Sequence, residues 1–243
     1  MKLVKLYPHM SPEQVAIVIN ADFGGLLNIR CSKLNPELCK FLLESFNPNT
    51  CELVFPGRGS IPVTEESVWE VVGVPWGEEE VIYRVDKDST EFMRKQMGLS
   101  NRKQPTLTFL EKKLVDSKKA DSTYLRLWSV YAVSSVVAPN TGTKVSPRIY
   151  PSFCNIKKVN KLNVCKFVII MLIKAAKKGV EKGILKACML YLMVWIPINP
   201  FFFFFDFFTF DALFFYFDGV DMDMNTPAGG TNSFFCFCVH IFF

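Results

Sequence analysis

Lysine and arginine are missing from the last 48 residues of this 243-residue chain, although the rest of the chain contains 28 of them. The same segment, 196–243, holds 16 of the 24 phenylalanines, including the run Phe201–Phe205, and its only charged side chains are five aspartates. Residues 1–195 carry the 28 basic residues against 18 acidic ones, a net charge of +10. The sequence therefore predicts two parts: a domain of ordinary globular composition over 1–195, and a phenylalanine-rich low-complexity tail over 196–243.

Histidine is nearly absent, since only His9 and His240 occur, one near each end. A cysteine protease needs a Cys–His pair with an orienting third group, so no protease domain is predicted. No GK[ST] or GxGxxG pattern is present, and the glycines of Pro56-Gly57-Arg58-Gly59-Ser60 are interpreted as a turn rather than a phosphate loop. We therefore predict no catalytic residues, no cofactor-binding residues, and a protein that is not an enzyme.

Cysteine pairs of the CxxC type are also missing among the eight cysteines. The first residues are too short and too broken an apolar segment for a secretory leader, so the thiols are expected in a reducing compartment. Six are predicted to be small buried hydrophobic residues: Cys31, Cys39, Cys51, Cys154, Cys165 and Cys188. Cys236-Phe237-Cys238 with His240 lacks a second ligand pair, so no metal site is predicted there.

The first 195 residues contain clear signals for the starts of helices. Three starts combine a capping side chain with proline or acidic residues in the first turn: Ser11-Pro12-Glu13-Gln14, Asn35-Pro36-Glu37 and Thr64-Glu65-Glu66-Ser67. The third helix has the apolar face Val68, Val71 and Val72 and is expected to end at Gly73-Val74-Pro75.

Leu53-Val54-Phe55 and Ile61-Pro62-Val63 flank the turn and predict a short β-hairpin, with Pro62 confining its strand to an edge. Glu78–Glu80 is interpreted as a solvated acidic loop. The predicted fold class is mainly α with a small β-hairpin, as a single helical domain followed by the hydrophobic tail.

Later segments predict buried helices. Tyr124–Val137 is apolar on nearly every side, so this helix belongs in a core, and Trp128 and Tyr131 are predicted to be packing residues before they are ligand contacts. Val164–Ala176 and Gly183–Val194 predict two further helices.

Several of these segments resemble the plant mobile domain family, also called aminotransferase-like, and related grass proteins. The resemblance covers residues 10–194 and rests on Ile61–Pro75, on Tyr124–Trp128 through Ala138-Pro139, on Tyr150–Phe153 and on Asn163–Phe167. Val164 stands where many members have tryptophan, a departure expected to alter packing rather than fold.

The resemblance implies a largely helical, transposon-derived protein, nuclear or nucleocytoplasmic, that acts as a non-catalytic interaction module with unknown proteins, chromatin-associated ones among them. Some grass relatives continue into a ubiquitin-like-protease domain, so a truncated protease-family remnant is the alternative. The name aminotransferase-like implies no activity here, because no segment presents the Schiff-base lysine, aspartate partner and phosphate cup of a pyridoxal enzyme.

The charge of residues 1–195 permits contact with nucleic acid, but the basic residues come as scattered pairs, which favours a solvated basic surface.

The tail has two interpretations. A phenylalanine run is what a T-rich stretch yields when translated, which predicts a gene-model artefact or a disordered segment. Alternatively, the 19 uncharged residues Ala187–Phe205 predict a membrane anchor.

Overall fold

The computed structural model describes residues 2–31, 33–99, 104–139, 143–179 and 187–198. These residues are mainly helical with a small antiparallel sheet, which confirms the predicted fold class. The α-helices are α1 (Pro12–Ile19), α2 (Pro36–Ser45), α3 (Glu65–Val72), α4 (Lys87–Gln96), α5 (Leu107–Asp116), α6 (Ser122–Ala132), α7 (Tyr150–Cys154), α8 (Val164–Lys178) and α9 (Met189–Ile198). The shorter elements are the 3₁₀ helices η1 (Leu3–His9), η2 (Gly24–Asn28), η4 (Pro147–Ile149) and η5 (Ile156–Lys161), the π-helical turn η3 (Val133–Val137), and the strands β1 (Phe46–Asn47), β2 (Glu52–Phe55), β3 (Gly59–Pro62), β4 (Glu79–Glu80) and β5 (Leu162–Asn163).

The three predicted helix starts are confirmed by their caps. In α1 the Ser11 hydroxyl accepts from the Gln14 backbone N–H at 3.3 Å, while the Gln14 side chain accepts from the Ser11 N–H at 3.0 Å. Asn35 caps α2 through two backbone N–H groups, and the Thr64 hydroxyl caps α3 by accepting from Ser67 at 3.1 Å. Each cap satisfies backbone donors that a helix start would otherwise leave without partners.

Gln14 has a second role, because its amide is buried between α1 and the segment after α5. Its side-chain nitrogen donates to the carbonyls of Ser117 (3.0 Å) and Lys119 (3.1 Å). Gln14→Ala leaves both carbonyls without this donor and removes the capping interaction, so we expect a loss of about 2 kcal/mol in the free energy of unfolding. Urea unfolding measures it, with Glu13→Gln at the exposed neighbouring position as the control; equal midpoints for the two variants would contradict this role.

The predicted hairpin is present as β2 and β3, and the structure adds a third strand that the sequence analysis missed. The order is β1-β2-β3, all antiparallel, with Phe46 opposite Leu53 and Leu53 opposite Ile61. Pro62 ends the edge strand β3, as predicted. The strand β1 is only two residues long and directly follows α2, so its sequence carries no alternation that could reveal it.

Glu78 is an exposed loop residue, as interpreted, but the interpretation was wrong for Glu79 and Glu80. Glu79 and Glu80 form β4, which pairs in parallel with β5. Glu79 contacts the Lys158 ammonium at 3.0 Å and Glu80 contacts that of Lys166 at 2.6 Å. The partners are about 80 positions away along the chain, so local sequence does not reveal them.

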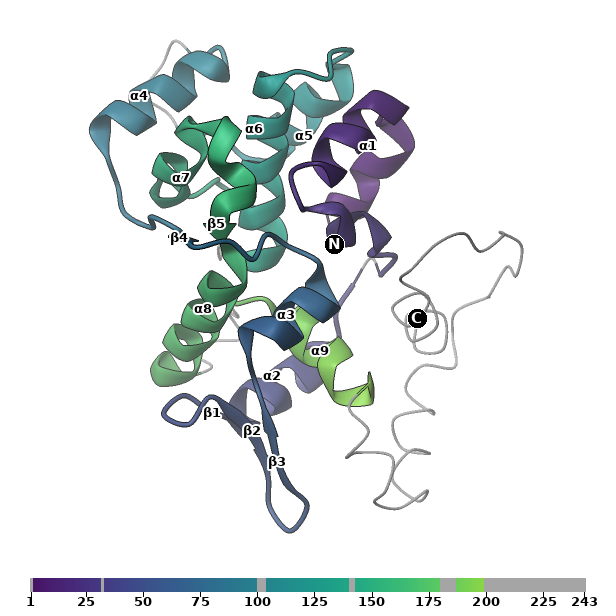
Figure 1. The fold of residues 1–243 in the computed structure, drawn as a ribbon, viewed down its shortest axis with the longest axis vertical. Helices are drawn as coiled ribbons and strands as arrows, with labels where there is room; N and C mark the ends of the chain where they lie inside the picture. Colours follow the sequence, from purple (N-terminus) through teal and green to yellow (C-terminus); the bar gives the residue numbers. More distant parts are fainter. Residues whose placement is uncertain (1, 32, 100–103, 140–142, 180–186, 199–243) are drawn as a thin grey trace, which may run out of the picture.

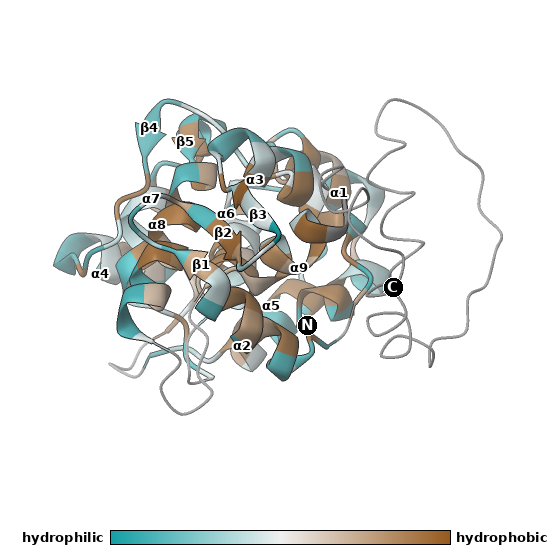
Figure 2. Ribbon diagram, turned by 90° about the horizontal axis from the view of Figure 1, so that it is seen from below, coloured by the Kyte–Doolittle hydropathy of each residue, from teal (hydrophilic) through white to brown (hydrophobic). Residues whose placement is uncertain are grey.

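Two groups of helices share one core. Figure 1 shows α1 and α4–α7 at one end of the molecule and α2, α3, α8 and α9 at the other, with the sheet beyond α2. In Figure 2 the polar segments α4 and β4 (teal) lie at the periphery. Trp128 and Tyr131 of α6 are fully buried, which confirms them as packing residues.

Arg126, the one basic residue of α6, is buried together with the apolar residues of this helix. Its guanidinium donates to the carbonyl of Phe153 at 3.0 Å and lies 5.1 Å from the centre of the Phe92 ring. A buried cation needs such partners to offset the loss of water. Arg126 therefore ties α6 to α7 and α4.

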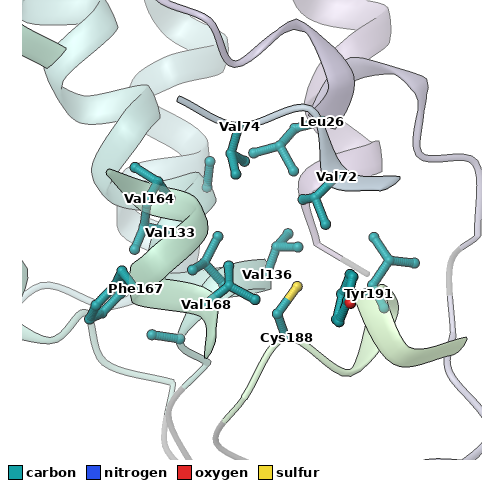
Figure 3. Packing of buried hydrophobic residues seen from close by; sticks show 14 of the residues in the cluster. Leu26, Val72, Val74, Val133, Val136, Val164, Phe167, Val168, Cys188 and Tyr191 are labelled. Atoms are coloured by element: carbon teal, nitrogen blue, oxygen red, sulfur yellow. The ribbon is translucent and has the colours of Figure 1, made fainter. Parts of the chain in front are cut away.

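The last described helix, α9, completes the core. Figure 3 shows Cys188 and Tyr191 beside Val72 of α3, Val136 of η3 and Val168 of α8. The Tyr191 hydroxyl lies 2.7 Å from that of Ser67, and Cys39 of α2 lies 3.6 Å from the Met193 sulfur. The helix expected over 183–194 begins only at Met189, because Ala187 and Cys188 form a buried, non-helical turn before it.

The segment proposed as a membrane anchor, Ala187–Phe205, is described only to Ile198, and its residues from Ala187 to Val194 are buried in this core. Within the described ranges, none of the helices combines the length and the apolar composition that crossing a membrane requires. The rest of the predicted tail, 199–243, lies outside the described residues.

Burial of the thiols gives a test of this packing. Cys39, Cys165 and Cys188 are buried as predicted, while Cys31, Cys51 and Cys154 are half-buried. Burial raises the pKa of Cys39 to about 11 and those of Cys165 and Cys188 to about 12, so at pH 8 these groups stay protonated and inert. We expect iodoacetamide to leave all three unmodified in the native protein and to modify them in urea, as read by peptide mass spectrometry; rapid native labelling of Cys188 would show that α9 is not packed.

Candidate functional site

The sequence predicted no catalytic, cofactor-binding or metal-ligating residues. Over the described ranges, no three His, Cys, Asp or Glu side chains gather in a way that could hold a metal ion. His9 is exposed at the end of η1, and Cys236, Cys238 and His240 lie outside the described residues. A shallow hollow between β4 and α8 has Glu80 and Lys166 among its lining residues, and these two pair with each other.

Two of the four tryptophans lie on the surface next to each other. Trp69 is 51% exposed and Trp76 is 48% exposed, whereas Trp128 is fully buried. The centres of the Trp69 and Trp76 rings are 6.3 Å apart and the ring planes are inclined by 40°. Tryptophan is enriched among the residues that dominate binding at protein interfaces, so this exposed pair is the candidate binding surface.

The fold of α3 places Trp69 outward. Val68, Val71 and Val72 are buried against α8 and α9, and the buried Ser67 hydroxyl contacts Tyr191. At 100° per residue, Trp69 falls on the opposite side of the helix from these residues. The α3 helix is thus anchored by one face and presents the other to solvent.

Glycine shapes the turn after α3. Gly73 ends the helix in the left-handed conformation, with φ of 58°. Its backbone packs directly on Gly25 of η2, where an added side-chain carbon would lie 2.4 Å from the Gly73 α-carbon. Residues 74–77 then pass beside the start of α8, where the Val164 N–H donates to the Pro75 carbonyl at 2.9 Å.

Trp76 is held in place by groups from two distant parts of the chain. Its indole N–H donates to the Glu65 carboxylate at 3.0 Å, and the Asn163 side-chain amide donates to the same oxygen at 2.8 Å. Trp76 also forms a backbone bridge with Asn163, and the Gly77 N–H donates to the Leu162 carbonyl at 3.1 Å. We call Trp69, Trp76 and Glu65, which accepts the hydrogen bond from Trp76, the tryptophan platform.

The electrostatic surroundings of the platform differ from those of the rest of the domain. Residues 59–83 contain six glutamates and neither lysine, arginine nor histidine. Glu79 and Glu80 are paired with lysines, and the hydrogen bond from Lys166 lowers the pKa of Glu80. Glu65 accepts the hydrogen bonds from Trp76 and Asn163. The remaining three, which we call the acidic rim, are exposed and form no ion pair with any described residue: Glu66, Glu70 and Glu78.

The exposed pair Trp69 and Trp76 was not predicted from the sequence. A signal was available: Trp69 lies at a polar position of the helical period set by Val68, Val71 and Val72. Its partner Trp76 carries no such signal, because it lies in a non-helical segment whose position depends on Glu65 and Asn163.

A protein-family model described as a domain of unknown function (DUF8566) matches residues 1–193. No curated protein matches the chain, and no solved structure matches it.

Proposed function

We propose that this chain, which belongs to the DUF8566 family, is a non-catalytic interaction module whose partner protein binds at the tryptophan platform. The observation that carries the proposal is the pair of half-exposed, adjacent tryptophans, Trp69 and Trp76, on a rigid part of the fold. Tryptophan is enriched among the few residues that supply most of the binding energy at protein interfaces.

Rigidity strengthens the argument. An interface side chain that must be ordered on binding costs about 0.5–1.5 kcal/mol. The hydrogen bond from Trp76 to Glu65 and the backbone bridge to Asn163 order Trp76 before any partner binds. A surface prepared in this way supports tight binding with a small contact area.

Affinity capture with the purified full chain tests the proposal. The Trp69→Ser/Trp76→Ser variant should lose the proteins that the wild type retains, while Phe109→Ser, at an exposed aromatic position on α5, should keep them. Circular dichroism must first show that both variants are folded. Retention of the same proteins by the tryptophan variant would overturn the proposal.

The remaining functional expectations stay predictions. They are the mobile-element origin, the nuclear or nucleocytoplasmic location, the protease-family remnant and the membrane anchor. Direct nucleic-acid binding also stays a prediction: the described basic pairs are spread over α4, α5, the segment after α5, η5 and α8. A nucleic-acid affinity that falls steeply with salt would support it.

A further inference from the structure

We propose that the partner bound at the tryptophan platform is a basic segment, in which a lysine or arginine side chain packs on the exposed indoles and neighbouring cations pair with the acidic rim. This inference rests on the proposed function and specifies the chemistry of its partner.

Charge is the first argument. The domain as a whole is strongly basic, yet the platform lies in a stretch of 25 residues, 59–83, that contains no cation. Glu66 and Glu70 flank Trp69 on the exposed face of α3, and Glu78 is two residues beyond Trp76. An acidic peptide or a nucleic-acid phosphate would meet these carboxylates and be repelled, whereas a basic segment gains from each of them.

The indoles supply the second argument. The polar N–H of Trp76 already donates to Glu65, so the part of the ring left in water offers its apolar face rather than a donor. A cation over the face of tryptophan is the strongest of the cation–π pairs in proteins. The domain uses the same contact internally, where the Arg126 guanidinium packs on Phe92.

Pairing within the chain supplies the third argument. Lys158 of η5 and Lys166 of α8 are held by Glu79 and Glu80. They are therefore committed to β4 and do not neutralise the acidic rim.

The test uses the full chain and fluorescently labelled short peptides in which lysine and arginine alternate with glycine and serine. Fluorescence anisotropy at low and at physiological salt gives the affinities. The comparison peptides replace the cations with glutamine, with glutamate, or with leucine. We expect binding of the basic peptide only, with an affinity that falls as salt rises because the rim carboxylates are exposed.

Three variants locate the binding. Trp69→Ser/Trp76→Ser should weaken binding by about thirtyfold. Conversion of the acidic rim to glutamine should weaken it by about tenfold at low salt and flatten its salt dependence. The matched control converts three exposed glutamates elsewhere, Glu37, Glu44 and Glu91, to glutamine and so changes the net charge equally. At physiological salt it should weaken binding by less than about threefold, because the attraction between exposed, distant charges is largely screened there.

The outcomes separate the two proposals. Equal losses for the rim and control variants would show non-specific attraction and overturn the inference. Preferred binding of the leucine or glutamate peptide would also overturn it. If the basic peptide fails to bind while the platform tryptophans still control capture of a protein, the basic-segment inference falls and the interaction module stands.

Discussion

Leu192→Asp is expected to unfold the whole domain. Leu192 is fully buried in α9, which packs against α2 and α3, and no basic residue occurs after Lys186 to pair with a new carboxylate in this helix. Burial of an unpaired charge, together with the lost apolar packing, costs about 5 kcal/mol or more. A domain of this size is stable by about 5–15 kcal/mol, so a loss of about 5 kcal/mol or more equals or exceeds the lower end of that margin.

Circular dichroism and urea unfolding measure this effect, with Leu192→Met as the control of conserved volume. The control should cost less than about 1.5 kcal/mol. A native spectrum and an unchanged urea midpoint for Leu192→Asp would contradict the placement of α9 in the core. That result would also return residues 187–198 to the membrane-anchor interpretation.

Gly77→Ala has the second large expected effect. A side-chain carbon at Gly77 would lie 2.1 Å from the Lys161 carbonyl oxygen, a backbone atom that cannot move without breaking the β4–β5 pairing. We expect a loss of about 3 kcal/mol in stability, comparable with other overpacked sites. Since the same segment holds Trp76 against Asn163, binding at the tryptophan platform should be lost as well.

Gly24→Ala is the matched control, because its added carbon would meet its nearest neighbour, in Ile19, at an ordinary 3.5 Å. Thermal unfolding and peptide binding are measured on both variants. Gly77→Ala with the stability and binding of the control would mean that the contact between residues 77 and 161 does not position the platform.

Local features of the fold could be predicted because they depend on neighbours in the sequence. Ser11 with Gln14, and Thr64 with Ser67, are capping pairs three positions apart, and the structure contains both. The buried helix around Trp128 follows from its apolar composition alone. The hairpin with Pro62 at its edge follows from turn residues between two apolar segments.

Features that depend on distant residues could not be predicted. The pairing of Glu80 with Lys166 and the anchoring of Trp76 by Asn163 join segments more than 80 positions apart. From the sequence alone, Arg126 interrupts an apolar helix. Its burial is explained only by its contacts with Phe153 and Phe92, which lie on other helices. The platform belongs to this second kind, so the sequence did not locate it. The interaction module was expected from the family resemblance, the basic charge and the missing catalytic residues, and it stays a proposal.

Site-directed photo-crosslinking tests the central claim most directly. A benzoylphenylalanine placed at position 69 or 76 should capture a partner protein, and the same residue at position 109 on α5 should not. Phe109 is exposed and aromatic, so the control has similar chemistry on a different element. Capture at 69 and 76 alone is the predicted result; capture at 109 with none at 69 or 76 would contradict the account.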